Sequence, residues 1–184
     1  MDPLRLLQRF YDPHGKAYGI LVAHGMQVSA KALAVARQVP HLNPDPGFIH
    51  EAAMLHDIGI FLTKAPVLGC RGRYPYVCHG YLGARILYDM GFPAHAAVCE
   101  RHVGAGLTAE EIHRQELPLP RRDMLPQSTD ELIVAYADKF FSKNGGPKTA
   151  KPTAAILNEL ARHGAAAAAR FRSWIDLLEP STGC

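Results

Sequence analysis

The sequence lacks the features that mark export, membrane spans and disulfide scaffolds. It has no run of 18 uncharged apolar residues, and its first residues show neither the charged region nor the apolar region of a secretory signal. Its four cysteines, Cys70, Cys78, Cys99 and Cys184, show no C-x-x-C spacing, so reduced thiols are expected. These absences predict a cytoplasmic protein that does not bind membranes.

The net charge of the chain is also low. The formal net charge is only +3, so no stable nucleic-acid binding is expected. With 184 residues, of which 48% are hydrophobic and 20% charged, the chain has the composition of a globular protein with a real core. Histidine is abundant, with ten residues, and the function depends on how many of them converge.

Helix signals are frequent and strand signals are nearly absent, which predicts an all-α fold. Residues 15–39 are apolar on most faces and end at a proline, as in a buried core helix. Asp45 precedes a proline and is expected to cap a helix that reaches residue 57 and is ended by Gly59. Residues 60–78 are rich in glycine and proline and are expected to form a long irregular loop.

The second half of the chain reads as further helices separated by turns. Two capping boxes are expected, Thr108 with Glu111 and Ser128 with Glu131. A hinge is expected at residues 145–147, and Gly164 is a potential break in the terminal segment. The expected helices cover residues 80–91, 93–104, a short stretch after 108, 128–142 and 152–178.

Three positions combine metal-binding side chains with an apolar setting. His56 and Asp57 lie at a helix end, where the backbone can direct adjacent side chains into one cavity, and this pair suits divalent iron, manganese, cobalt or zinc. His24 lies on an apolar helix face, either as a ligand or as a core histidine bonded to a backbone carbonyl. Asp138 also lies in apolar company, and a buried carboxylate needs a cation, which is either a metal or an arginine.

The series His24, His56, Asp57 and Asp138 resembles the H…HD…D signature of the HD superfamily. The Ile-Gly pair that follows Asp57 is similar to the HDIG subgroup. The resemblance covers most of the chain, and its motifs are specific in combination but weak singly. It implies that these four residues bind a catalytic divalent metal.

The expected hinge and the resemblance, which covers roughly residues 15–143, together suggest a domain organisation. Residues 1–145 are expected to form the catalytic, metal-binding HD domain, a bundle of about five core helices. Residues 146–184 are expected to form a C-terminal helical extension that packs on this core or on a second subunit, so both a monomer and a homodimer are compatible with the sequence.

Two more histidines fall between the second and last elements of the motif. His79 stands at a helix start and His102 at a helix end, and the order H…HD…H…H…D is similar to that of dinuclear HD proteins. On this resemblance Asp57 bridges two metals, and His79 and His102 hold the second. One metal or none remains an alternative. The metals implied are iron or manganese, with zinc, cobalt, nickel or magnesium as further candidates.

The sequence departs from the HD-GYP cyclic dinucleotide phosphodiesterases. The GYP-type motif is missing, Val103 rather than a second histidine follows His102, and Ile60 replaces the lysine that follows HDIG in that group. These departures disfavour cyclic dinucleotide hydrolysis. The chain is more similar to small, stand-alone HDIG proteins.

The activity implied is metal-dependent hydrolysis of a small phosphate ester, with a nucleotide among the candidates, by a metal-activated water. A diiron oxygenase and a non-catalytic domain that binds a nucleotide or metal are the alternatives. The expected catalytic residues are Asp57, Lys139 and Glu100. The expected substrate-binding residues are cations that fit phosphate, although loop cations are often only solvated: Arg101, Arg71, Arg73 and Lys64.

Overall fold

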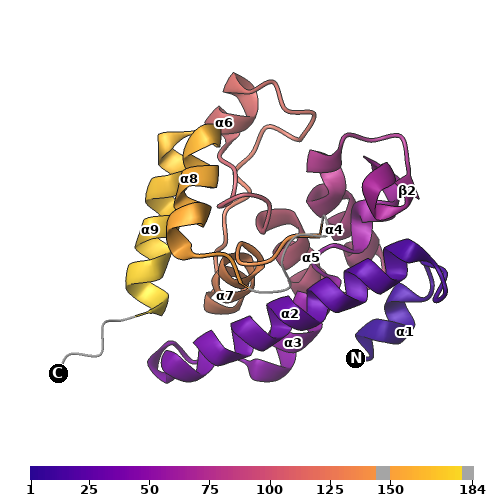
Figure 1. Cartoon of the computed structure of the whole chain (residues 1–184), viewed down its shortest axis with the longest axis horizontal. Helices are drawn as coiled ribbons and strands as arrows, with labels where there is room; N and C mark the ends of the chain where they lie inside the picture. The colour runs from indigo at the N-terminus through magenta and orange to yellow at the C-terminus, as the bar shows by residue number, and fades with distance from the viewer. Residues whose placement is uncertain (144–149, 180–184) are drawn as a thin grey trace.

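The computed structural model describes residues 1–143 and 150–179 and is dominated by helices (Figure 1). Only two short strands interrupt them in these two ranges, so the all-α prediction is confirmed. The α-helices are α1 (Pro3–Leu7), α2 (Lys16–Gln38), α3 (Pro46–Leu55), α4 (His79–Asp89), α5 (Pro93–Arg101), α6 (Ala109–Arg114), α7 (Thr129–Asp138), α8 (Thr153–His163) and α9 (Ala165–Leu178).

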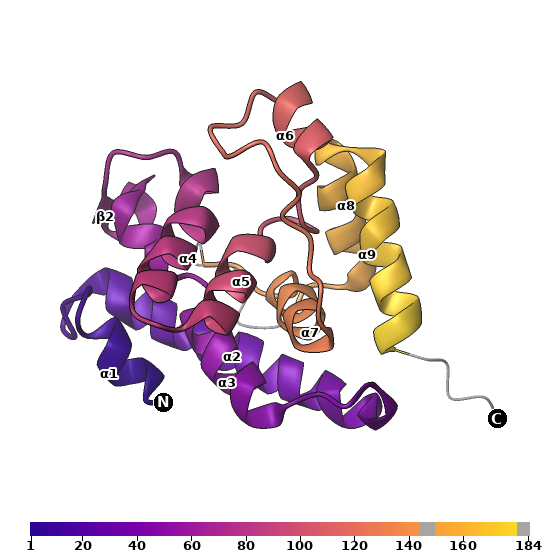
Figure 2. The same cartoon turned by 180° about the vertical axis from the view of Figure 1, so that it is seen from behind.

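Five helices, α2, α3, α4, α5 and α7, pack against one another and form the central bundle. Helix α7 lies in the middle of the molecule, with α4 and α5 on one side and α8 and α9 on the other (Figures 1 and 2). The fully buried side chains Ile49, Ile133 and Tyr136 belong to α3 and α7 and lie in the same core. The predicted bundle of about five core helices is therefore confirmed.

All three predicted capping residues cap their helices, but only one of the two expected capping boxes is complete. The Asp45 side chain accepts hydrogen bonds from the first turn of α3, and Thr108 and Glu111 form a complete capping box at α6. At α7 the Ser128 hydroxyl accepts from the Glu131 amide, but the Glu131 carboxylate does not return to it. It accepts instead from the Gln127 amide and from Arg101, so the second capping box is only half formed.

Two helix ends differ from the prediction. Helix α7 ends at Asp138 rather than near residue 142, and α3 ends at Leu55. Gly59 does not end α3 by adopting a left-handed conformation, since it lies within a 3₁₀ turn, η2 (Ile58–Leu62). A Cβ on Gly59 would lie 2.2 Å from the His79 carbonyl oxygen, so the glycine is required because α4 approaches closely.

The expected loop over residues 60–78 has more structure than predicted. It contains a two-residue antiparallel hairpin of β1 (Lys64–Ala65) and β2 (Cys70–Arg71). Two further 3₁₀ turns, η3 (Pro66–Leu68) and η4 (Tyr76–Cys78), flank β2, and another, η1 (Pro40–Leu42), follows α2. The turn η4 leads directly into α4 and so positions its first residue, His79.

The C-terminal helices α8 and α9 lie side by side in both views (Figures 1 and 2). Gly164 separates them with a φ of 145°, a conformation that favours glycine, so the predicted break is confirmed. The Phe171 ring stacks on Tyr136 of α7 with centroids 5.2 Å apart. Phe171 thus packs α9 on the bundle, and Ile156 and Leu160 of α8 belong to the same core. The proposed hinge at residues 145–147 and the boundary at 145/146 lie outside the described residues.

Helix α2 is long and apolar enough to cross a membrane by length and composition alone. The core helix of a folded protein passes the same test, and 44% of its most apolar 18-residue window is buried inside the protein. Val28, Ala32 and Val35 of this helix belong to the main core. Helix α2 is therefore a core helix, and its length and composition do not indicate a membrane span.

Candidate metal centre

Three histidine rings are oriented by the same kind of local hydrogen bond to the backbone. His56, His79 and His102 each lie at a helix terminus, and each Nδ1 lies 2.7 Å from the carbonyl oxygen of the residue three positions earlier. An Nδ1–H that donates to a carbonyl fixes the ring and leaves the Nε2 lone pair for a metal. The local backbone therefore pre-orients three potential ligands.

The Asp57 carboxylate lies between two pairs of histidines. Its Oδ2 is 3.2 Å from Nε2 of His56 and 3.5 Å from Nε2 of His24. Its Oδ1 is 3.2 Å from Nε2 of His79 and 3.6 Å from Nε2 of His102. Each oxygen thus faces a different pair, which is the arrangement that a bridging carboxylate requires, although the number of metals stays a prediction.

The backbone at the end of α3 explains how neighbours reach one site. His56 keeps a helical conformation, whereas Asp57 has φ −103° and ψ 8° and leaves the helix. This change brings both side chains to the same cluster, as the helix-end argument predicted. Asp138 arrives from the last turn of α7, with its Oδ1 2.9 Å from Nε2 of His24 and 3.4 Å from Nε2 of His56.

This donor set fits a divalent cation. His24, His56 and Asp138 offer ligand atoms within 4.8 Å of one another, as do His56, Asp57 and His102. Within the described ranges, Nε2 of His56 and both carboxylate oxygens of Asp57 are buried and make no regular hydrogen bond, and the cation nearest to Oδ2 is the Lys143 ammonium at 2.6 Å. Buried polar atoms in this state are costly unless an ion satisfies them. Nitrogen and oxygen ligands of this kind suit iron, manganese or zinc.

The pair of histidines on the Oδ1 side of Asp57, His79 and His102, also indicates a cation site. Nε2 of His79 lies 3.1 Å from Nε2 of His102. Because both Nδ1 atoms face carbonyl oxygens, both Nε2 atoms are expected to carry lone pairs, and two lone pairs at this distance need a proton or a cation between them. Burial lowers the pKa of His102 to about 3, which keeps this imidazole neutral and able to act as a ligand.

The two carboxylates of the cluster are ionised. Burial raises the pKa of Asp57, but the charges of His56 and Lys143 outweigh this effect and hold it well below its usual value. Asp138 behaves similarly, because Lys139 and Lys143 stabilise its charged form. Burial lowers the pKa of His56, but the Asp57 and Asp138 carboxylates raise it more, with a net rise to about 9. A metal ion bound at Nε2 would take the place of that proton.

Two lysines reach the cluster. Nζ of Lys139 lies 2.7 Å from Oδ2 of Asp138 and donates to the carbonyl of His102. Nζ of Lys143 lies 2.6 Å from Oδ2 of Asp57 and 3.8 Å from Oδ1 of Asp138. Burial lowers the pKa of Lys143, but the two carboxylates raise it further, so the ammonium form prevails.

Glycine lets the ligand-bearing helices approach one another. A Cβ on Gly80 would lie 2.5 Å from the carbonyl oxygen of Cys99, in the helix that precedes His102. Together with Gly59, this residue brings α4 against both α5 and the turn after α3. The Tyr11 hydroxyl fixes that turn, because it donates to the Ile58 carbonyl at 2.8 Å and accepts from the Phe61 amide at 3.1 Å.

Of the predicted catalytic residues, Asp57 and Lys139 lie at the cluster, but Glu100 does not. Glu100 stands two positions before His102 in the chain, about 200° around the helix, and pairs with Arg122 on another surface. The structure therefore does not bring Glu100 to the cluster, because its side chain faces another surface of the helix.

The four predicted substrate-binding cations also lie elsewhere. Arg101 makes a bidentate pair with Glu131 at 3.0 and 2.8 Å. Arg71 is exposed on β2, Arg73 donates to the exposed Tyr74 hydroxyl, and Lys64 is exposed on β1. Lys64 also lines a separate pocket together with Tyr76 and Lys143. The structure therefore does not bring the four cations to the cluster itself, because closeness in sequence to a ligand does not fix the direction of a side chain.

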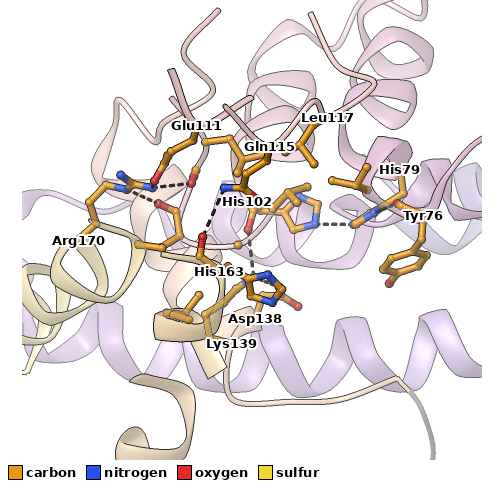
Figure 3. A pocket seen from close by; sticks show the side chains of 18 of the residues that line it. Tyr76, His79, His102, Glu111, Gln115, Leu117, Asp138, Lys139, His163 and Arg170 are labelled. Carbon is orange, nitrogen blue, oxygen red and sulfur yellow. Dashed lines mark hydrogen bonds and ion pairs between the residues drawn. The ribbon is translucent and has the colours of Figure 1, made fainter. Parts of the chain in front are cut away.

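The sequence reasoning missed other residues near the centre. Lys143 and Tyr76 line the cavity beside the cluster, together with Glu111 and Arg170 from the far side (Figure 3). A lysine five residues after the last ligand was a usable signal for Lys143. No local pattern pointed to Arg170, which lies 32 residues after Asp138 in the chain.

The chain belongs to the HD domain family, whose match covers residues 21–142. It is 39% identical over 123 residues to an uncharacterized protein of Methanocaldococcus jannaschii, covering 65% of each chain. It is also 32% identical, over 66% and 67% of its length, to the tRNA (cytidine(56)-2'-O)-methyltransferases of Thermoplasma volcanium and Picrophilus torridus. The chain spans only 32% of each of these two enzymes. No solved structure matches significantly.

Membership of the HD family and the clustered histidines and aspartates support binding of a divalent metal. The identity and the number of the metals, the HDIG subgrouping and the role of each ligand stay predictions.

Proposed function

We propose that the protein is a metal-dependent phosphohydrolase that cleaves a small phosphate monoester. The observation that carries the proposal is the convergence of six histidine and aspartate donors with two lysine ammonium groups at one end of a cavity. A phosphate group approaching this end would meet positive charge from both lysines. Membership of the HD family supports the same chemistry.

The ligand assignment follows the two sides of Asp57. His24, His56, Asp57 and Asp138 would hold one divalent ion, and Asp57, His79 and His102 would hold the second. Such ions lower the pKa of a bound water towards 7 and supply hydroxide at neutral pH. The protein contributes rigid imidazoles, a low-dielectric setting and a fixed negative charge at Asp57.

Lysines complete the reaction. We assign Lys143 and Lys139 to the phosphoryl oxygens, because both ammonium groups lie at the cluster and line the cavity. The oxygen of water forms a bond to phosphorus while the ester P–O bond breaks. The departing alkoxide oxygen takes a proton, for which the Lys139 ammonium is the candidate donor, and the proton released by the attacking water restores that ammonium. The products are the alcohol and inorganic phosphate.

The methyltransferase activity in the names of two relatives is not part of this proposal. The segment shared with those enzymes is a third of their length, so their activity can reside in the other two thirds. A diiron oxygenase would use the same six donors, and oxygen uptake therefore belongs in the test.

The test compares the protein with Asp57→Asn, and uses Asp176→Asn, an exposed position on α9, as the matched control. Each protein is reconstituted with manganese or iron, its metal content is measured, and phosphate release from p-nitrophenyl phosphate is followed beside oxygen uptake. We expect Asp57→Asn to lose bound metal and at least about a hundredfold in kcat/KM, because even residues supporting a ligand contribute about 10–100-fold. Full activity in Asp57→Asn, or no metal in the reconstituted protein, would refute the proposal.

A further inference from the structure

A cavity of about 470 Å³ extends from the metal centre towards the C-terminal helices. His79 and Tyr76 lie on one side of it, and Glu111 and Arg170 lie on the opposite side (Figure 3). Its volume is within the usual range for a pocket that encloses a small organic ligand. The cavity is therefore large enough for the organic part of a substrate whose phosphate lies at the centre.

Much of the wall of this cavity away from the metal centre is apolar, and Gln115 and His163 are polar residues that also line it. Side chains from several elements contribute to it, including Val103, Leu107, Leu117, Leu160 and Ala167. Leu160 and Ala167 are buried and come from α8 and α9, so the C-terminal helices supply part of the wall. An apolar group placed here would be removed from water, which favours its binding.

The two charged groups on that side, Arg170 and Glu111, are already engaged with one another. Arg170 donates to the carbonyl oxygens of Ala105 and Gly106, each at 3.0 Å, and to the Glu111 carboxylate at 2.8 and 2.9 Å. The Glu111 carboxylate also accepts from the Thr108 amide at 2.9 Å. Because these groups bond to each other, they offer little to a sugar hydroxyl or to the edge of a base.

We infer that the substrate is an alkyl or aryl phosphate whose apolar organic group occupies this cavity. This inference rests on the proposed phosphohydrolase function for the phosphate end. It disfavours a nucleotide or a sugar phosphate, because a hydroxyl buried against an apolar wall loses its hydrogen bonds to water. Each such hydroxyl costs about tenfold or more in affinity.

The first experiment measures binding without turnover. Straight-chain alkylphosphonates with two, four and six carbons have a C–P bond that the reaction does not cleave, and calorimetry on the metal-reconstituted protein gives their Kd. We expect the affinity to rise by about threefold to fourfold per methylene until the cavity is filled. Ribose 5-phosphate and a nucleoside monophosphate, as polar probes, should bind more weakly than the six-carbon phosphonate.

Two matched variants locate the organic group. Ala167→Leu adds three carbons at a buried position that lines the cavity, and Ala166→Leu adds them at the exposed neighbouring position of the same helix. Leucine is well tolerated in helices, so both variants should keep α9. In the Ala167→Leu variant, we expect the six-carbon phosphonate to bind no more tightly than the four-carbon one. The Ala166→Leu variant should show the same dependence of affinity on chain length as the unaltered protein.

The outcomes separate this inference from the proposed function. Affinity independent of chain length in the unaltered protein, or tightest binding of the nucleoside monophosphate, would overturn the inference even if Ala167→Leu failed to fold. Hydrolysis of sugar phosphates in preference to alkyl phosphates would overturn it and leave the phosphohydrolase intact. A clear chain-length dependence with no ester hydrolysed would support the apolar cavity and refute the phosphohydrolase.

Discussion

Arg170 links the C-terminal helices to the loop that follows His102, and its replacement by methionine is the sharpest test of the packing around the cavity. The guanidinium makes four hydrogen bonds, two to backbone carbonyls and two to the Glu111 carboxylate. Its side chain is 22% exposed and that of Glu111 only 6%, so the carboxylate is the more deeply buried partner. Methionine keeps a similar apolar stem but removes every donor.

The magnitude follows from what the variant leaves unsatisfied. A hydrogen bond to a charged group contributes about 1.5–3 kcal/mol, and a buried group that loses its partner costs about 1–3 kcal/mol. In the variant, Glu111 keeps its hydrogen bond from the Thr108 amide, and water can reach the partly exposed position of Arg170. The loss of stability is therefore smaller than the sum of the four separate hydrogen bonds. We expect Arg170→Met to lower the free energy of unfolding by about 2–3 kcal/mol at pH 7.

The size of this effect should depend on pH. Burial raises the pKa of Glu111, but the hydrogen bond from Thr108 and the Arg170 charge lower it more, and the net shift is below the usual 4.5. A carboxyl whose pKa is lower in the folded protein stabilises it above the pKa of the unfolded chain. That stabilisation is lost as the pH falls through the folded-state value. The difference between Arg170→Met and the unaltered protein should therefore be largest near neutral pH and shrink below about pH 4.5.

Urea unfolding followed by circular dichroism at pH 7 and at acidic pH measures this difference. Arg172→Met, at an exposed position two residues along the same helix, is the control and should change stability by less than about 0.5 kcal/mol. Arg170→Lys keeps the charge but loses the fork geometry, so it should be intermediate. An Arg170→Met effect that is equal at both pH values, or no larger than the control, would refute the reasoning.

Three further predictions concern the centre and its support. His79→Ala should reduce the metal content from about two equivalents to one, because only Asp57 and His102 would remain on that side; unchanged content would exclude His79 as a ligand. Tyr11→Phe should lower the free energy of unfolding by about 1–3 kcal/mol, since the hydroxyl bonds two backbone groups of the turn after Asp57. Gly59→Ala should cost about 3 kcal/mol and weaken metal retention, because its Cβ would force α4 and His79 to move; a stable variant with full metal content would contradict this packing argument.

Much of the fold could be predicted because the signals for it are local. Asp45 caps α3 through its own side chain, and Gly164 breaks the terminal segment through its own backbone conformation. The end of α7 could not be predicted in this way. The apolar pattern continues through Phe140 and Phe141, but the helix stops at Asp138, and the Lys151 amide donates to the carbonyl of Phe140. That contact comes from a later part of the chain and leaves no local mark.

The histidines and aspartates of the centre could be predicted because a family motif records them. The structure adds the physical reason why these side chains point into the cluster. Nδ1 of His56, of His79 and of His102 each bonds to the carbonyl oxygen three residues earlier, and this contact is not visible in the sequence. His24 is different, since its Nδ1 has no hydrogen-bond partner among residues 1–143 and 150–179. It is also the ligand candidate that lies within a long helix rather than at a helix end.

Among the cationic residues named from the sequence, Lys139 lies at the cluster. The positions of the others could not be predicted, because a guanidinium or ammonium group is placed by the buried carboxylate with which it pairs. Arg101 is adjacent to a candidate ligand, yet Glu131 is 8–10% exposed and takes both of its bonds. The Asp57 and Asp138 carboxylates take the ammonium groups of Lys143 and Lys139 for the same reason. Buried carboxylates, once placed, are therefore better guides to functional cations than closeness in sequence. By the same argument, Arg170 is held by Glu111 and shapes the cavity wall. Lys143 and Lys139 differ because their carboxylate partners are themselves proposed metal ligands, and the proposal therefore assigns the phosphate to these two lysines.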